Sequence, residues 1–291
     1  MPKVFNGNYN DIFDVKGKKV VIVGGAGGFG KEIGIAFAEC GADVLITSRR
    51  EDALIAACED IKARAAAGVK VAYFAGDAGE EEAVKAMLDY TVSAEGLGGC
   101  DIVVNSQGYN KKMWSWEIDT TVWNAMLQTN ITSVMFICKY FGNWMKNNNL
   151  EGGDVCTLPE AGQPNTNKGY GKIINIGSVR GIRAVGNGGG GNVGYNTTKG
   201  AVEMMTKAFA QDLRPNVQVN LVGPTITYTP MMVGILPPDE NVRNGIAANQ
   251  AAQRIGYESD IVGTVLFLAS PASDFVTANS IYPDGGLVSV S

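Results

Sequence analysis

Residues 19–30 read KVVIVGGAGGFG, and this stretch decides the fold. Its first five residues are mostly branched and apolar, the pattern of a strand buried on both faces. The next seven positions hold five glycines, and residues 33–38 then look like a packed helix that ends at Gly41. A second strand follows at residues 43–47. The order of strand, glycine turn, helix and strand is what a dinucleotide-binding unit requires.

The glycine turn is the predicted contact with the phosphates of that dinucleotide. Glycine permits the tight turn, lets the backbone approach the diphosphate, and lets the helix pack closely on the sheet. The free N–H groups at the helix N-terminus then face the phosphates. We therefore predict that Gly24, Gly28, Phe29 and Gly30 belong to a cofactor site.

The end of the second strand indicates which dinucleotide binds. A chain that uses NAD usually carries an acidic residue here to hold the ribose hydroxyls. This chain reads Thr47-Ser48-Arg49-Arg50 and has no carboxylate at that point. A hydroxyl followed by arginine suits a 2′-phosphate, so Ser48 and Arg49 favour NADP(H), with NAD(H) as the alternative.

Strands and helices continue to alternate along the rest of the chain. The sequence predicts strands at 69–74, 101–105, 172–176, 217–222 and 280–282, and helices at 53–67, 80–94, 120–146, 196–213 and 261–268. This alternation is typical of an α/β fold, a Rossmann-type, doubly wound parallel sheet flanked by helices. We expect a single domain over residues 1–291, with an N-terminal extension at 1–16, a surface insertion at 147–171 and a substrate lid at about 225–256.

Composition excludes several other classes of protein. The 291 residues carry a net charge of −5 and no basic run, so we expect no nucleic-acid partner. No signal peptide is visible and no apolar stretch approaches a membrane span, which favours the cytoplasm. The five widely spaced cysteines are typical of reduced thiols. Because the chain has no histidine, histidine-based triads and metal sites with histidine ligands are excluded, and we expect no metal.

Proton chemistry is expected at Tyr195-Asn196-Thr197-Thr198-Lys199. Residues four apart share one face of a helix, so the lysine ammonium can lie beside the tyrosine phenol. At about 4 Å and an effective dielectric of about 20, the pair would be worth about 4 kcal/mol, or roughly three units in the pKa of the phenol. The tyrosine would then serve as an acid or base near neutral pH. The same spacing arises by chance in many chains, so the motif gains its weight from its place after the glycine turn.

With these motifs in series, the chain resembles the short-chain dehydrogenase/reductase family over nearly its whole length. Residues 105–108 read Asn-Ser-Gln-Gly where the family has Asn-Asn-Ala-Gly, and residues 229–230 match its Thr-Pro. The resemblance implies a nicotinamide cofactor that is held, beyond the turn and the second strand, by Asp77, Asn105, Gly108, Tyr195, Lys199 and Thr229.

The resemblance also implies a catalytic tetrad. Asn130 stands at the place of the family's helix asparagine, and Ser178, Tyr195 and Lys199 follow in the family's order. These residues imply hydride transfer between the nicotinamide and a carbonyl or secondary alcohol. Tyr195 would exchange the proton, Lys199 would lower its pKa and hold the ribose, Ser178 would bind the substrate oxygen, and Asn130 would hold a water.

Two departures from the family pattern concern the cofactor and the substrate. Val23 and Gln107 replace side chains that normally tie the glycine turn to the fourth strand, which predicts weaker cofactor binding. Ser178 and Tyr195 are seventeen positions apart, where the family more often has about thirteen, and the extra length is a glycine-rich loop at 186–192. That loop would either reshape the substrate pocket or close on the substrate.

Basic residues after two strands suggest an anionic substrate. Lys111 and Lys112 follow the fourth strand, and Arg180 and Arg183 follow the fifth. The stretch 108–112 also resembles the gluconate 5-dehydrogenase-type members of the family, which favours a sugar acid or polyol. A 3-oxoacyl-type ketone is the alternative, because Trp114, Trp116, Tyr228, Met231 and Met232 would suit an apolar pocket.

Two further expectations concern the class of protein and its assembly. A relative of the same fold that binds NADP as a sensor without catalysis is a second alternative, which the intact tetrad disfavours. The apolar helices 120–146 and 196–213 predict a homo-oligomer, a tetramer as in much of the family.

Overall fold

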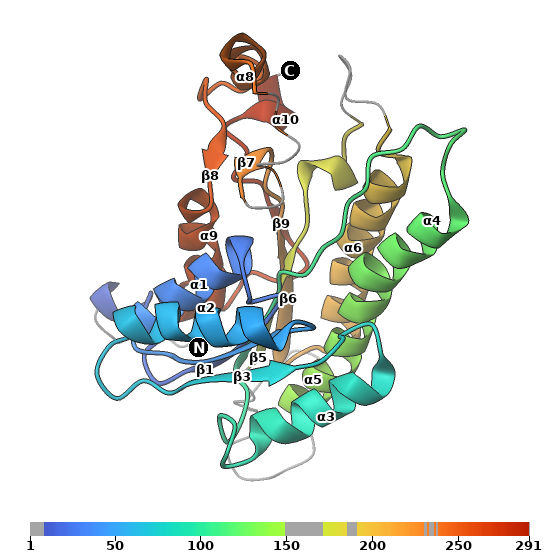
Figure 1. Cartoon of the computed structure of the whole chain (residues 1–291). Helices are drawn as coiled ribbons and strands as arrows, with labels where there is room; N and C mark the ends of the chain where they lie inside the picture. Colours follow the sequence, from blue (N-terminus) through green and yellow to red (C-terminus); the bar gives the residue numbers. More distant parts are fainter. Residues whose placement is uncertain are drawn as a thin grey trace, which may run out of the picture.

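A seven-stranded sheet forms the centre of the structure, a computed structural model that describes residues 9–148, 171–184, 191–229, 232, 236 and 238–290 (Figure 1). Its strands are β1 (Lys19–Val23), β2 (Asp43–Ser48), β3 (Val71–Ala75), β4 (Ile102–Asn105), β5 (Gly171–Ile176), β6 (Val217–Val222) and β9 (Ser280–Ile281). All neighbouring strands are parallel and their order is β3-β2-β1-β4-β5-β6-β9. The order reverses between β1 and β4, and ligands of such sheets bind at that switch point.

Helices cover both faces of this sheet, which confirms the predicted fold class (Figure 1). One face packs against α1 (Gly28–Glu39), α2 (Glu51–Arg64) and α9 (Ser259–Ala269). The other packs against α3 (Glu81–Val92), α5 (Ser133–Asn148) and α6 (Val193–Asp212). The smaller elements are η1 (Tyr9–Asp11), η3 (Val179–Gly181), β7 (Thr227–Tyr228), α8 (Glu240–Ala247), β8 (Gly256–Tyr257), η4 (Pro271–Ser273) and α10 (Leu287–Val290).

The alternating side chains of β1 divide the hydrophobic core between the two faces. Val20 and Ile22 belong to the cluster under α1 and α9, whereas Val21 and Val23 belong to the cluster under α5 and α6. All four are at most 2% exposed. A run of branched apolar residues is what a strand covered on both sides needs, and residues 19–23 form an interior strand of the sheet, between β2 and β4.

Helix α1 ends in the glycine-dependent way that the sequence predicts. Gly41 has φ = +83°, a left-handed conformation that costs little without a Cβ. The N–H of Ala42 donates to the carbonyl of Phe37 (3.0 Å), and the N–H of Gly41 donates to that of Ala38 (3.2 Å). This pair of hydrogen bonds satisfies the last carbonyls of the helix and turns the chain into β2.

The long helix predicted at 120–146 is interrupted, which corrects that expectation. It consists of α4 (Thr120–Leu127), a π-helical turn η2 (Gln128–Thr132) and α5. The hydroxyl of Ser133 donates to the carbonyl of Thr129 (2.6 Å), a side-chain hydrogen bond that competes with the regular helical pattern. Such π turns are frequent at functional sites. This turn carries Asn130.

Several sequence predictions lie outside the described residues. They are the first half of the N-terminal extension (1–8), most of the surface insertion (149–170), most of the glycine-rich loop (185–190), and residues 230, 231, 233–235 and 237 of the lid. The four described cysteines are free. Within the described ranges, no helix has both the length and the apolar character that crossing a bilayer would require.

Candidate active site

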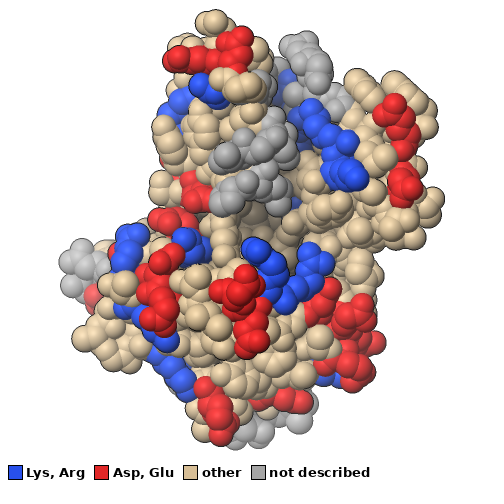
Figure 2. Space-filling view, viewed as in Figure 1, with Lys and Arg blue, Asp and Glu red and all other residues tan. Residues whose placement is uncertain are grey.

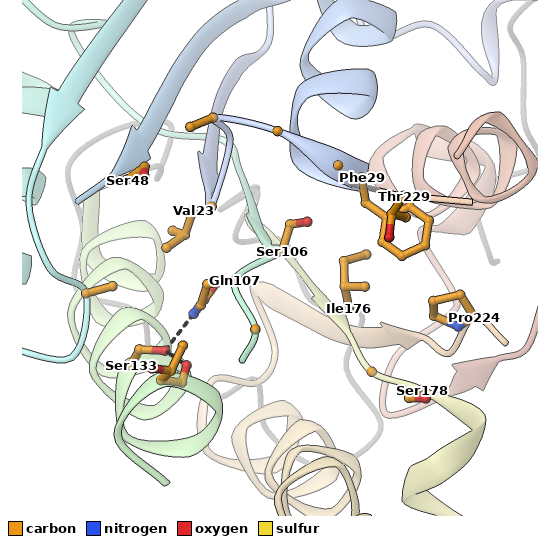
Figure 3. Close-up of a pocket in the computed structure, with 18 of the residues that line it drawn as sticks. Val23, Phe29, Ser48, Ser106, Gln107, Ser133, Ile176, Ser178, Pro224 and Thr229 are labelled. Carbon is orange, nitrogen blue, oxygen red and sulfur yellow. Dashed lines mark hydrogen bonds between the residues drawn. The ribbon is translucent and has the colours of Figure 1, made fainter. Parts of the chain in front are cut away.

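A cleft opens at the carboxyl ends of β1, β2, β4 and β5, where the sheet order reverses. Of the predicted site residues, it is lined by Gly24, Gly28, Phe29, Ser48, Arg49, Asp77, Gly108, Ser178, Tyr195, Lys199 and Thr229. Figure 3 shows that the cleft is elongated, since Ser48 lies at one end and Ser178 and Thr229 lie at the other. The structure therefore brings most of the predicted residues together around one elongated space.

The glycine turn is held by close contacts between main chains. The N–H of Gly24 donates to the carbonyl of Thr47 (2.8 Å), and Gly24 has φ = +81°. A Cβ on Gly24 would lie 2.8 Å from the nitrogen of Gln107, and a Cβ on Gly30 would overlap the carbonyl oxygen of Gly24. Glycine is therefore required at both positions by packing.

The same turn leaves room for a phosphate group. A Cβ on Gly27 would meet no atom within 4 Å, and no side chain caps the N-terminus of α1. Two buried oxygens along the cleft, Thr47 Oγ1 and Gln107 Oε1, have no hydrogen-bond partner. Free helical N–H groups beside an open cradle suit an anion, and unpaired oxygens suit hydroxyl donors of a ribose. The residues present thus fit a nicotinamide dinucleotide.

The glycine turn remains connected to the loop after β4 although Val23 and Gln107 depart from the family pattern. The N–H of Ser106 donates to the carbonyl of Val23 (2.9 Å), so the main chain itself joins β1 to the loop after β4. The amide of Gln107 donates to the hydroxyl of Ser133 (2.9 Å) and so links this loop to α5 (Figure 3). These bonds supply connections in place of the family's side chains.

The end of β2 presents a cation to the cleft. Arg49 lies 3.8 Å from the carboxylate of Asp77, and both side chains are largely exposed, at 66% and 45%. Exposed pairs of this kind contribute little because solvent screens them. The guanidinium of Arg49 is therefore available to a stronger anion such as a phosphate.

Asn105 does not line the cleft, which departs from the predicted cofactor contact. Its amide donates to Asn175 Oδ1 (2.8 Å), and the amide of Asn175 donates to Thr206 Oγ1 (2.9 Å). All three residues are at most 1% exposed. The side chain of Asn105 thus joins β4, β5 and α6 behind the cleft, because an amide buried there needs partners in the core.

Ser178 and Tyr195 meet at the other end of the cleft. Ser178 follows β5, and its hydroxyl oxygen accepts the N–H of Arg180 (3.1 Å). Burial raises the pKa of the Tyr195 phenol, whereas the hydrogen bond with Ser178 and the charge of Arg180 lower this pKa. The oxygen of Ser178 accepts this one bond, and its O–H remains able to donate to the phenol oxygen or to a substrate oxygen.

Lys199 lies one helical turn beyond Tyr195, as the sequence predicts. Its ammonium is 5.7 Å from the centroid of the Tyr195 ring and donates to the carbonyl of Ile176 (2.7 Å). Burial lowers the pKa of Lys199 to about 8. Lys199 is predicted from the sequence to lower the pKa of Tyr195. In the structure the pKa of Tyr195 is raised instead, chiefly by burial, and the groups that oppose this rise are Ser178 and Arg180.

The side chain of Asn130, which the resemblance predicts to hold a water, makes three hydrogen bonds within the protein. Its Oδ1 accepts the N–H of Tyr109 (2.7 Å), and its amide donates to the carbonyl of Tyr109 and to Thr198 Oγ1 (both 2.9 Å). The side chain is 1% exposed and lies outside the cleft lining. Its polar atoms are therefore already used, and they tie the loop after β4 to α6.

Sequence reasoning missed Thr198, which couples these elements. Its hydroxyl donates to the carbonyl of Tyr195 (2.8 Å) and accepts the amide of Asn130. It is fully buried in α6, between the two predicted catalytic residues. A hydroxyl within Tyr-Asn-Thr-Thr-Lys was visible in the sequence, but its partner on η2 was not, because the two lie far apart in the chain.

The loop after β4 also touches the start of α6. The N–H of Met113 donates to the carbonyl of Gly191 (2.7 Å), and Met113 forms a parallel bridge with Asn192. A Cβ on Gly191 would lie 3.2 Å from the backbone of Met113. This clip, formed by Met113 and residues 191–192, connects two walls of the site.

Comparisons with known proteins show relatives that share this fold. A family model described as enoyl-(acyl carrier protein) reductase matches residues 24–288. An oxidoreductase of Mycobacterium tuberculosis is 31% identical over 95% of this chain and 94% of its own. A crystal structure of a gluconate 5-dehydrogenase from Burkholderia cenocepacia, in complex with NADP and tartrate, aligns with a TM-score of 0.83 at 26% identity, over 98% of this chain and 100% of that one. A short-chain type dehydrogenase/reductase from Mycobacterium marinum aligns with a TM-score of 0.82 at 28% identity, over 97% and 100%.

Proposed function

The chain belongs to the short-chain dehydrogenase/reductase family and is an oxidoreductase acting on alcohol or ketone groups, and we propose that it transfers hydride between NADP(H) and a sugar acid or polyol. The observation that carries the proposal is the cleft itself. An anion cradle with the exposed side chain of Arg49 lies toward one end, and Ser178, Tyr195 and Lys199 lie at the other. A dinucleotide with its adenosine half at the first end and its nicotinamide half at the second would bring the nicotinamide next to a small alcohol bound at Ser178 and Tyr195.

In this proposal the protein handles the proton, and the bound nicotinamide supplies or accepts the hydride. The Tyr195 hydroxyl gives its proton to the carbonyl oxygen in reduction, and the phenolate takes the hydroxyl proton in oxidation. Ser178 donates a hydrogen bond to the same oxygen, where negative charge develops. Lys199 holds the ribose, while Asn130 and Thr198 keep α6 in register with the loop after β4.

Two observations support NADP(H) over NAD(H). Ser48 and Arg49 line the end of the cleft where the adenosine ribose would lie, and the carboxylate of Asp77 makes only a long, exposed pair with Arg49. The aligned gluconate 5-dehydrogenase was crystallised with NADP. Both are consistent with an arginine that binds a 2′-phosphate.

Two observations support an anionic substrate: the ligand of a relative, and the cations that border the hollow. The aligned gluconate 5-dehydrogenase carries tartrate, a hydroxy acid. Figure 2 shows Lys and Arg side chains bordering the hollow at the centre of that face, on its upper right and lower sides. Cations near a cleft raise the local concentration of anionic substrates.

The test is a turnover assay with a matched pair of variants. NADP(H) and NAD(H) are each offered with a panel of sugar acids, polyols and ketones, and nicotinamide absorbance is followed. Tyr195→Phe should lower the rate by about 10²- to 10⁴-fold without weakening NADPH binding, because only the proton donor is lost. Tyr90→Phe, whose ring packs on Phe74 in the α3 layer, should behave as the wild type. Equal rates for the wild type and Tyr195→Phe would refute the mechanism.

A 3-oxoacyl-type ketone reductase is the second candidate. The matched family model carries an acyl-carrier-protein description, and Ile226 and Met232 add apolar surface to the cleft. Acetoacetyl thioesters in the same panel separate the two candidates. Tight NADPH binding with no turnover across the panel would instead favour the non-catalytic sensor.

We also propose a cytoplasmic homotetramer. The residue Met204, on the outward side of α6, is 63% exposed despite its apolar side chain. Surfaces of this kind are commonly covered by another subunit. Size-exclusion chromatography with light scattering tests this, and a monomeric mass would contradict it.

A further inference from the structure

Gln107, in the loop after β4, lies against the glycine turn and lines the cleft. A Cβ on Gly24 would lie only 2.8 Å from the main-chain nitrogen of Gln107, so the two main chains are in close contact. Figure 3 shows Gln107 between Ser48 at one end of the cleft and Ser178 at the other. Its side chain therefore stands midway along the cleft, beside the turn that would hold the diphosphate.

A chain of hydrogen bonds fixes the orientation of the Gln107 amide. The Ser133 hydroxyl donates to the carbonyl of Thr129 (2.6 Å), so its single proton is already used. The oxygen of Ser133 can then only accept, and it accepts from Nε2 of Gln107 (2.9 Å, Figure 3). If the amide were turned over, two oxygens with no proton between them would face each other. The nitrogen therefore belongs on the Ser133 side of the amide, and Oε1 on the other side.

The oxygen of this amide is left without a donor. Nε2 has two acceptors, Ser133 Oγ and, at 3.5 Å, Asn105 Oδ1. Gln107 Oε1 is buried, and none of the described residues donates a hydrogen bond to it. An unpaired buried amide oxygen costs free energy, and a ligand that brings a donor removes this cost. Because an amide oxygen only accepts, the ligand group must carry an O–H or N–H.

The position of Gln107 indicates which part of a dinucleotide offers that donor. The diphosphate has acceptors alone, whereas each ribose carries hydroxyl groups. The next residue, Gly108, lies toward the nicotinamide side, since a Cβ there would be 3.9 Å from Lys199 Nζ. Gln107 lies toward the adenosine side, because Gly24, which it contacts, donates to the carbonyl of Thr47 (2.8 Å) at the end of β2.

We propose that Gln107 Oε1 accepts a hydrogen bond from the ribose of the adenosine half of the cofactor. This inference rests on the proposed function, since it adds a residue to the proposed cofactor site. In NADP(H) the 2′-oxygen carries the phosphate, so the donor is the 3′-hydroxyl. The departure of Gln107 from the family pattern then strengthens cofactor binding, whereas the sequence led us to expect the opposite.

The experiment compares two ligands that differ in one hydroxyl. Binding of NADPH and of its 3′-deoxy analogue to the full-length protein is measured by fluorescence titration, for the wild type and for Gln107→Met. Methionine keeps the side chain unbranched and flexible but has no amide oxygen. With NADPH, Gln107→Met should raise Kd about 5- to 20-fold, because the hydroxyl loses its acceptor. With the 3′-deoxy analogue, wild type and variant should agree within about twofold, so the ratio of the two changes isolates the hydroxyl.

Two further variants support the comparison. Gln107→Asn keeps an amide but withdraws its oxygen by one carbon, so it should show the same pattern, and it serves if Gln107→Met does not fold. Gln218→Met is the matched control, because the amide of Gln218 donates to the carbonyl of Asp274, and neither residue lines the cleft. It should leave both Kd values unchanged.

The outcomes separate this inference from the proposed function. Equal losses of affinity for the two ligands, or no loss for either, would overturn the inference while the proposed function stands. If the wild type binds neither NADPH nor NADH, the proposed function fails, and the inference fails with it.

Discussion

The two ends of the cleft are held together by different kinds of contact, main-chain contacts at one end and side-chain hydrogen bonds at the other. At the cofactor end, Gly24 and Gly30 pack directly on main-chain atoms, and hydrogen bonds between backbones join β1 to the loop after β4. At the proton-transfer end, side chains from separate elements meet, and Asn130, Thr198 and Tyr195 are connected through hydrogen bonds of their amide and hydroxyl groups. The cofactor end depends on glycines that have no Cβ. The proton-transfer end depends on the polar groups of its side chains.

This difference teaches where each kind of substitution acts. Adding one carbon should harm the cofactor end through packing, since protein interiors have little spare volume. Removing one polar atom should harm the proton-transfer end, since a buried partner is then left unsatisfied. The following predictions test that contrast, from the largest expected effect to the smallest.

Gly30→Ala should give the largest loss of stability. Its Cβ would overlap the carbonyl oxygen of Gly24, and neither main chain can move without breaking the turn. We expect a loss of about 3 kcal/mol or more in the free energy of unfolding, measured by urea titration.

Gly27→Ala is the control for this substitution. Its Cβ would enter open space, so the free energy of unfolding should change by less than about 1 kcal/mol. NADPH binding should nevertheless weaken, because the methyl group would occupy the proposed phosphate cradle. Equal destabilisation by both substitutions would show that the cofactor end does not depend on close main-chain packing.

Lys199 should make the stability of the protein depend on pH. Burial lowers its pKa to about 8, below the value of about 10.4 in an unfolded chain. Between these values the unfolded state binds more protons, so the free energy of unfolding should rise with pH by up to about 3 kcal/mol. Below pH 8 the cost of burying the charge is fully present. In Lys199→Met this rise should be absent, and parallel urea titrations at pH 7.5, 9 and 10 would measure the difference. Identical slopes for the two proteins would contradict the prediction.

Thr206→Val tests the network behind the cleft. The hydroxyl of Thr206 accepts the amide of Asn175 and donates to the carbonyl of Val202. Its loss should cost about 1–3 kcal/mol, because a buried amide remains unsatisfied. Thr91→Val is a matched control, since its buried hydroxyl donates only to Met87 of its own helix. Thermal unfolding of both should separate them by several degrees, and equal midpoints would remove the role given to the network.

Arg49→Gln should have the smallest effect, because the side chain is 66% exposed. We expect NADPH binding to weaken roughly tenfold while NADH binding is unchanged, measured by fluorescence titration. Arg64→Gln, which breaks the surface pair with Glu39, should alter neither. A loss of NADH affinity of the same size would assign Arg49 to the shared part of the two cofactors.

The sequence predicted the cofactor end in detail because its determinants are local. Glycine spacing, a buried strand and the cap at Gly41 all lie within about 25 consecutive residues. Each is dictated by backbone conformation or by the periodicity of apolar residues. The structure places ten of the predicted cofactor residues along one cleft, and the two it leaves out of the lining, Gly30 and Asn105, serve packing and the core.

At the proton-transfer end, the sequence predicted the residues but not the hydrogen bonds between them. The π turn that carries Asn130 depends on partners at Tyr109 and Thr198, which no local pattern reveals. Similarly, Arg180 and Arg183 look alike in the sequence. One difference is that Leu287, more than a hundred residues away, accepts a hydrogen bond from Arg183. Long-range side-chain contacts decide both points.

The clip between Met113 and residues 191–192 restricts the motion of two walls of the site relative to each other. The amide of Met113 lies in a loop, yet it should exchange with deuterated solvent as slowly as the first turn of α6, because one hydrogen bond joins the two. The two walls would then travel as one rigid piece. Any widening of the entrance for a larger molecule must come from the opposite rim.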